Sequence, residues 1–147
     1  WLWTLDYVSS HPFGGSFDVY KINHFELPLP NGNILTINAK AFHSIYFQVL
    51  GELGIPGALM FAALIIIAMA SLMKVRKIAR QQGSLWLHDI ANALLLSLLV
   101  YFAGGAFIGV AFQSYFYYLA ALSAVVLRLA VKQENSTRVV PATQPSY

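Results

Sequence analysis

Polar side chains interrupt an apolar stretch at residues 42–57, which read FHSIYFQVLGELGIPG. At helical spacing they form one stripe with His43 at its edge. The members of the stripe are Lys40, Ser44, Gln48 and Glu52. A neutral imidazole can accept a proton from a hydroxyl near pH 7, so His43 is a candidate general base. The alternative is an interfacial helix whose polar stripe only faces water.

Cations near this stretch are candidates for binding an anionic group. Lys21, His24 and Lys40 precede or open the stripe. Charge-assisted hydrogen bonds to phosphate oxygens are strong, so we interpret these three as candidate phosphate ligands. Gln48 and Glu52 are further candidates for substrate binding. Each of these residues also suits ordinary solvated polar surface.

Several other chemistries find no support. His11, His24 and His43 lie far apart, and no HxxH or HExxH motif occurs, so we expect no metal site. The chain has no cysteine, which excludes thiolate chemistry. Gly14-Gly15-Ser16 lacks the full phosphate-loop pattern, and Gly-x-Ser-x-Gly is missing.

The composition indicates a membrane protein. Of 147 residues, 58% are hydrophobic and only 10% are charged, which is too few to cover the surface of a soluble domain. A net charge of +3 is too small and too scattered for a nucleic-acid surface. We therefore expect membrane lipids, and no nucleic acid, as partners.

Long apolar runs predict an all-α polytopic fold with three transmembrane helices, at about residues 56–73, 89–107 and 116–131. Gly54-Ile55-Pro56-Gly57 is expected to turn an interfacial helix into the first span. A cluster of basic residues follows that span and predicts a cytoplasmic loop at 74–84. Its members are Lys74, Arg76, Lys77 and Arg80.

The remaining segments follow from this topology. Residues 1–10 are expected to end a preceding interfacial or membrane helix. Residues 11–54 are expected to form a loop on the opposite side of the membrane from the basic residues, with one short strand near 34–37. Asn38 is expected to cap an interfacial helix at about 39–53. Polar residues 133–147 predict a disordered cytoplasmic tail.

Two segments resemble a known superfamily. HPFGGSFDVY, at residues 11–20, resembles the NPL-x-G-G-G-F type of segment in bacterial O-antigen ligases and polymerases. AFHSIYFQVLGELGIPGALMF, at residues 41–61, is similar to the H-[NS]-x-[YF]-x-x-x-x-x-E-x-G-x-x-G segment of the same superfamily. HSIYFQVLGE is particularly similar to the O-glycosylation ligases associated with exosortase systems. In order and topology the resemblance covers about residues 1–131.

The resemblance implies a multi-pass enzyme of the bacterial inner membrane with a GT-C-like fold. Such enzymes transfer a glycan from undecaprenyl diphosphate to a lipid or protein acceptor at the periplasmic face, and they need no metal or other cofactor. The family's motif histidine matches His43, which implies that His43 activates the acceptor hydroxyl or helps the diphosphate to leave.

The chain departs from the family in one respect. Family arginines bind the diphosphate, but residues 11–41 contain no arginine, so Lys21 and Lys40 would have to substitute for them. The first residue is Trp1 rather than Met, and we expect the sequence to be the C-terminal part of a longer protein with arginines upstream.

Three alternatives stay open. A polymerase of the same superfamily would use another lipid-linked glycan as the acceptor. A transporter or flippase segment would place charged residues inside its spans, where this chain has few. A non-catalytic membrane scaffold would not need the loop histidines.

Overall fold

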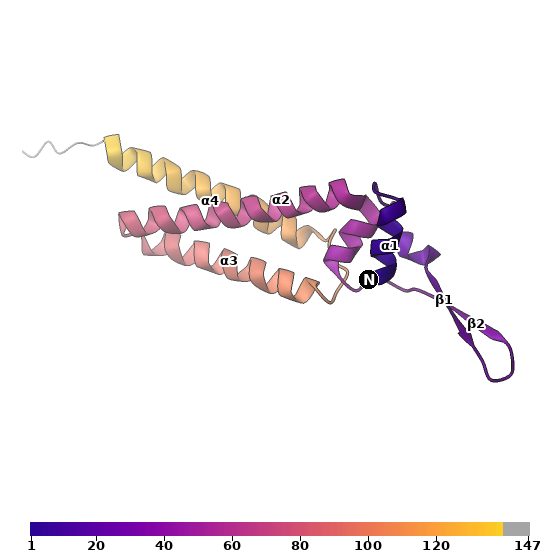
Figure 1. Cartoon of the computed structure of the whole chain (residues 1–147). Coiled ribbons are helices and arrows are strands. Elements are labelled where there is room, and N and C mark those ends of the chain that lie inside the picture. Colours follow the sequence, from indigo (N-terminus) through magenta and orange to yellow (C-terminus); the bar gives the residue numbers. More distant parts are fainter. Residues whose placement is uncertain (140–147) are drawn as a thin grey trace, which may run out of the picture. The chain divides into compact units, whose positions relative to one another are not determined.

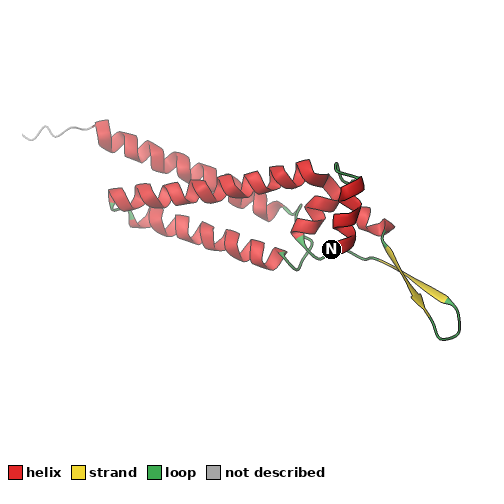
Figure 2. Ribbon diagram, in the orientation of Figure 1, coloured by secondary structure: helices red, strands yellow, loops and turns green. Residues whose placement is uncertain are grey.

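The computed structural model describes residues 1–139 of the chain, which are mostly helical (Figures 1 and 2). The elements in chain order are α1 (Leu2–Ser10), a 3₁₀ turn η1 (Val19–Ile22), β1 (His24–Pro28), β2 (Ile34–Asn38), α2 (Ile45–Gln82), α3 (Leu85–Gly105) and α4 (Ser114–Val139). The all-α expectation therefore needs one correction, because two strands lie between α1 and α2.

Three of the helices are long and apolar enough to cross a membrane: Ile45–Gln82, Leu85–Gly105 and Ser114–Ser136 of α4. This agrees with the prediction of three spans and with a membrane protein. The expected basic loop at 74–84 is mostly helical, because α2 continues through it. The helix ends where Gly83 takes a left-handed φ of 65° and Ser84 N–H bonds Ala79 C=O at 3.0 Å, a Schellman cap.

The chain folds as two compact units. The first contains residues 1–63 and 101–113, and the second contains 64–100 and the chain from Ser114 onward. In the second unit each of the three long helices has buried side chains. They include Leu72 and Val75 of α2, Leu87 and Leu98 of α3, and Ser123 and Ala130 of α4. Many other apolar side chains of these helices are exposed, as in helices that face lipid.

The strands form an antiparallel hairpin in the first unit. His24 pairs with Asn38, and Pro28 pairs with Ile34. Gly32 makes the turn with a φ of 81°. The one strand expected near 34–37 thus has a partner that the sequence analysis missed.

The start of the interfacial helix also differs from the expected Ala39. Asn38 belongs to β2, and Ala39 N–H extends the pairing by donating to Asn23 C=O at 2.9 Å. His43 then takes a left-handed φ of 52°, which no helical residue adopts. The helix begins at Ile45, where Ser44 C=O accepts the N–H of Gln48 at 2.9 Å.

Two end segments complete the comparison. Residues 2–10 are helical, as expected for the end of a helix. Residues 133–139, expected in a disordered tail, continue α4, because no proline or glycine stops the helix before Val139. The rest of the expected tail, 140–147, lies outside the described residues.

Candidate functional site

A break in α2 organises the first unit. Gly54 has φ 68° and ψ −164°, so the helix stops there and resumes beyond it. A break of this kind leaves carbonyl groups before it, and an N–H after it, without helical partners. Such groups need other hydrogen-bond partners when water cannot reach them.

The loop after α1 supplies those partners. Gly15 N–H donates to Gly51 C=O at 2.9 Å, and Ser16 N–H donates to Glu52 C=O at 3.0 Å. In the opposite direction, Ile55 N–H donates to Pro12 C=O at 2.8 Å. We call this contact between residues 12–18 and 51–55 the glycine joint. It brings together the two sequence segments on which the resemblance rests.

The joint requires glycine because backbone meets backbone. A Cβ on Gly14 would lie 2.5 Å from Gly54 N, and one on Gly54 would lie 2.3 Å from Pro12 O. Both residues also have left-handed φ values, 79° and 68°. On the neighbouring turn, a Cβ on Gly51 would lie 2.6 Å from the Phe42 ring. A side chain at Gly14 or Gly54 would push the loop off the helix, whereas one at Gly51 would displace the Phe42 ring.

Glu52 lies beneath the same loop. Glu52 is only 4% exposed, and its Oε1 accepts a hydrogen bond from the N–H of Asp18 at 3.1 Å. The other oxygen, Oε2, is buried without a hydrogen-bond partner among the described residues. Asp18 has a left-handed φ of 63°, which the bond to Glu52 helps to hold. The candidate substrate ligand Glu52 is thus placed where it supports the loop.

Gln48 connects the helix to the segment after α3. Its Oε1 accepts the N–H of Ala111 at 3.2 Å, and the side chain is partly buried. Ile45 and Val49 pack with Ala111 in a buried apolar cluster alongside this bond. Tyr46 Oη also donates to Phe102 C=O at 3.0 Å. These contacts hold the first turns of α2 on two sides.

His43 and Lys40 line one open groove, which we call the His43 groove. Its volume is about 460 Å³. The lining residues are Trp1, Asn23, Phe25, Ile37, Asn38, Ala39, Lys40, Ala41, Phe42 and His43. The lining therefore includes a histidine, a lysine and two asparagines beside apolar residues.

The His43 side chain is accessible beside an anchored stretch of backbone. Phe42 and Ser44 on either side are buried, whereas His43 is exposed. Phe42 C=O accepts the indole N–H of Trp1 at 3.0 Å, and the Trp1 ring stacks on Phe47 at 5.1 Å. The His43 side chain thus faces outward between two buried neighbours, on a backbone with a left-handed φ of 52°. Strained residues of this kind are concentrated at functional sites.

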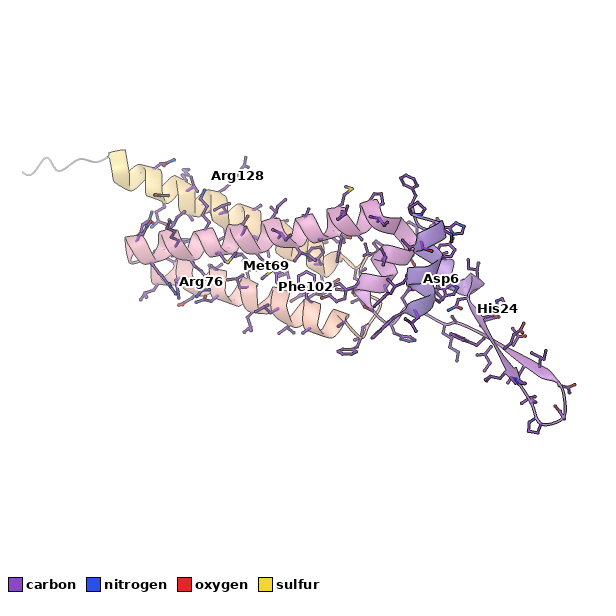
Figure 3. All side chains as sticks on the ribbon, viewed as in Figure 1. Asp6, His24, Met69, Arg76, Phe102 and Arg128 are labelled. Carbon is purple, nitrogen blue, oxygen red and sulfur yellow. The ribbon has the colours of Figure 1, made fainter. Side chains whose placement is uncertain are left out.

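Two other candidates lie outside the groove lining. Lys21 Nζ donates to Asp18 Oδ2 at 2.6 Å, and this bond raises the pKa of Lys21 above its usual value. His24 opens β1 (Figure 3), and its Nδ1 lies 3.3 Å from Ile22 O. Of the six site residues expected from the sequence, the structure brings His43 and Lys40 together. The other four, Lys21, His24, Gln48 and Glu52, are held elsewhere in the first unit.

The sequence analysis missed the groove residues contributed by the hairpin: Asn23, Phe25, Ile37 and Asn38. A signal for them existed. Pro30-Asn31-Gly32 is a strong turn sequence, and centring a hairpin on Asn31 pairs Phe25 with Ile37.

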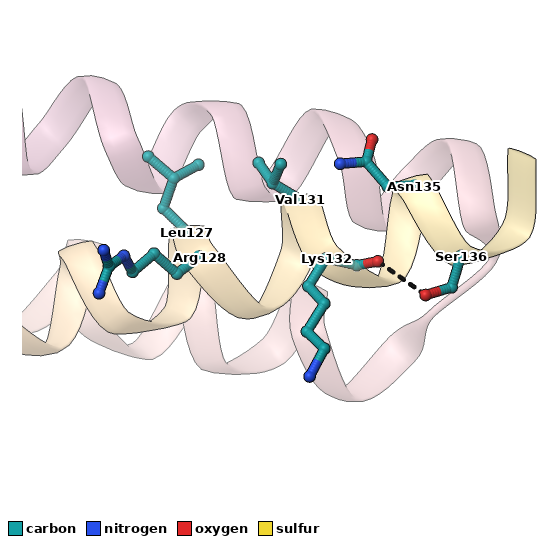
Figure 4. Close-up of a pocket in the computed structure, with 6 residues that line it drawn as sticks. All are labelled: Leu127, Arg128, Val131, Lys132, Asn135 and Ser136. Carbon is teal, nitrogen blue, oxygen red and sulfur yellow. Dashed lines mark hydrogen bonds between the residues drawn. The ribbon is translucent and has the colours of Figure 1, made fainter.

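A larger hollow of about 850 Å³ lies along α4 in the second unit (Figure 4). Its six lining residues, Leu127, Arg128, Val131, Lys132, Asn135 and Ser136, all come from this one helix. Ser136 Oγ donates to Lys132 C=O at 3.1 Å. The hollow has two cations but no histidine or carboxylate, so it lacks a group to accept a proton near pH 7. The His43 groove is the stronger candidate for chemistry.

Comparison with known protein families, with curated proteins and with solved structures finds no match to this chain.

Proposed function

We propose that the chain is part of a bacterial inner-membrane glycan ligase, similar to the O-antigen ligases, that transfers a glycan from undecaprenyl diphosphate to an acceptor hydroxyl at the periplasmic face. The observation that carries this proposal is the His43 groove. An accessible imidazole and an exposed lysine line one opening, in the unit where α2 sets out toward its membrane span.

The reaction assigns a role to each polar group in the groove. The acceptor oxygen forms a bond to the anomeric carbon while the bond from that carbon to the phosphate oxygen breaks, and the electron pair leaves with the diphosphate. The imidazole of His43 takes the acceptor proton. Lys40 stabilises the negative charge that develops on the leaving diphosphate.

The remaining lining suits an amphiphilic donor. Phe25, Ile37 and Trp1 offer apolar or aromatic surface to a polyprenyl chain or a sugar face. The side-chain amide of Asn23 can donate and accept hydrogen bonds with sugar hydroxyls. No metal enters this scheme, since a lysine supplies the positive charge.

The glycine joint and Gln48 contribute by positioning. They fix the first turns of α2, and His43 precedes that helix by two residues. A general base loses much of its effect when it is displaced by about 1 Å, so a rigid support suits this role.

The direct test is His43→Ala in the full-length protein, with glycan transfer measured in membranes at matched expression. Loss of the general base should lower transfer by about 10²- to 10⁴-fold. The matched control is His24→Ala, which removes an exposed histidine of the same unit from outside the groove lining, and which should retain transfer. Unchanged transfer in His43→Ala would refute the assignment.

The same assay separates a ligase from a polymerase. Membranes are supplied either with a lipid or protein acceptor or with a second lipid-linked glycan. We expect transfer to the former, and we expect His43→Ala to lower it by about 10²- to 10⁴-fold. Transfer only to the lipid-linked glycan would assign the chain to the polymerases.

A further inference from the structure

The hairpin is amphipathic, and its apolar side is uncovered. Neighbouring side chains in a strand point to opposite faces, and directly paired residues share a face. Phe25 pairs with Ile37 and Leu27 pairs with Leu35, so these four residues form one face, which we call the hairpin's apolar face. The opposite face carries His24, Glu26, Thr36 and Asn38, with Pro28 and Ile34 at the turn.

This apolar face needs a cover. Its four side chains are between 40% and 56% exposed, and all ten strand residues are exposed. A two-stranded hairpin is marginally stable in water on its own, and contiguous exposed apolar side chains usually mark a contact surface. We therefore expect an apolar surface, either lipid or protein, to cover this face.

One candidate membrane span begins in the same unit, and another ends there. The apolar part of α2 begins just beyond Gly54, and residues 106–113 join the candidate spans α3 and α4. Phe13, whose loop is bonded to Ile55, is 80% exposed, and Phe107 in the α3–α4 connection is 72% exposed. Exposed aromatic side chains where spans begin and end are typical of the membrane–water interface.

The charges on the hairpin fit a lipid surface. Glu26 is its only carboxylate, and it lies on the face away from the apolar side chains. Lys40 follows β2 by two residues, is exposed, and lines the same groove as Phe25 and Ile37. Lysine near an anionic membrane surface is stabilising.

We propose that the hairpin's apolar face rests in the boundary between headgroups and acyl chains of the membrane that α2 enters, while Glu26 and Thr36 face water. Interfacial segments bury their apolar side by about 5–10 Å, at a depth where water still reaches free backbone groups at the strand edges. Since Phe25 and Ile37 also line the His43 groove, the groove then opens at the lipid surface. This inference holds whether or not the chain transfers glycans.

The natural lack of cysteine makes the test direct. Leu35→Cys and its neighbour Thr36→Cys are each labelled with a nitroxide, in the full chain, in nanodiscs of phosphatidylethanolamine and phosphatidylglycerol. Collision rates with oxygen, which concentrates in lipid, and with a water-soluble nickel chelate are measured by electron paramagnetic resonance. We expect the label at 35 to favour oxygen and the label at 36 to favour nickel.

Two results would overturn the proposal. If both labels favour nickel, the face is open to water. If the label at 35 is shielded from both reagents, a protein surface covers the face, either a second copy or another partner.

A second pair of labels guards against a local effect of one substitution. Phe25→Cys and Glu26→Cys lie on the partner strand and should repeat the alternation, with oxygen favoured at 25 and nickel at 26. Loss of this alternation on β1 would count against the proposed face as directly as failure on β2.

Discussion

The loop of the glycine joint, residues 12–18, and the hairpin both belong to the segment between α1 and α2, yet they are held in opposite ways. In the joint, three backbone hydrogen bonds tie the loop to α2, and the glycines leave no space for a side chain. In the hairpin, every strand residue is exposed and nothing lies within 4 Å of a Cβ built on Gly32. The loop is therefore fixed by contacts with α2, whereas the apolar side chains of the hairpin are left uncovered.

The comparison shows that a left-handed glycine can be required for two different reasons. Gly54 and Gly32 have similar φ values, 68° and 81°. At Gly32 only the backbone conformation disfavours a side chain. At Gly54 the backbone of residues 12–14 also leaves no room for a side chain. Substitution at both positions separates conformational strain from steric exclusion.

The largest effect is expected for Gly54→Ala. A methyl group there would meet Pro12 O at 2.3 Å, so the loop must move and its hydrogen bonds must break. Strain, overpacking and lost bonds together should cost about 3 kcal/mol or more. Amide hydrogen exchange at Gly15, Ser16 and Ile55 should accelerate by 100-fold or more in detergent or nanodiscs.

Gly32→Ala is the matched control for the same measurement. The substitution carries the penalty of a left-handed alanine, about 1 kcal/mol, without any clash. Exchange in the joint should stay as in the unsubstituted protein. Acceleration of the joint amides by Gly32→Ala as well would show that their exchange does not report the contact at Gly54.

A smaller effect is expected at Glu52. Glu52→Ala removes the acceptor for Asp18 N–H and leaves that donor without its partner, at a cost of about 1–3 kcal/mol. Glu52→Gln keeps an acceptor oxygen and should stay within about 1 kcal/mol of the parent. Exchange at the Asp18 amide reports both changes. A glutamine variant as damaged as the alanine variant would show that the charge matters, and not the hydrogen bond.

The smallest effect is expected for Lys21→Gln, which breaks the exposed ion pair with Asp18. The pKa of Lys21 is raised by that bond, so its contribution is fully present below the pKa of the unfolded chain and is lost as pH rises through the folded pKa. That window lies above about pH 10. Between pH 6 and 8 the thermal midpoint should match the parent, and a clear drop would show that the pair matters more than its exposure suggests.

The spans could be predicted because long apolar runs have few alternatives in a folded chain. The ends of the spans could not be predicted, because the sequence from Lys74 to Gln82 is equally compatible with a loop and with the last turns of a helix. Only one of the two strands of the hairpin could be predicted from the sequence. Ile34 to Ile37 show strand propensity, whereas Glu26 and Pro28 obscure the partner strand.

The candidate site was predictable in its residue types but not in its grouping. His43 and Lys40 stand out because of chemistry, and the groove joins them to hairpin residues through a register that only pairing reveals. The burial of Glu52 was not predictable from its helical stripe. That stripe assumed a helix from Ala39, and the loop that covers Glu52 comes from more than thirty residues earlier in the chain.

The break at Gly54 has a consequence for hydration. A helix interrupted near a membrane normally needs water to satisfy the groups that the interruption exposes. Here Pro12, Gly15 and Ser16 act in place of that water. Three backbone groups at the bend are therefore satisfied within the protein, which lowers the hydrogen-bonding cost of placing the bend near hydrocarbon.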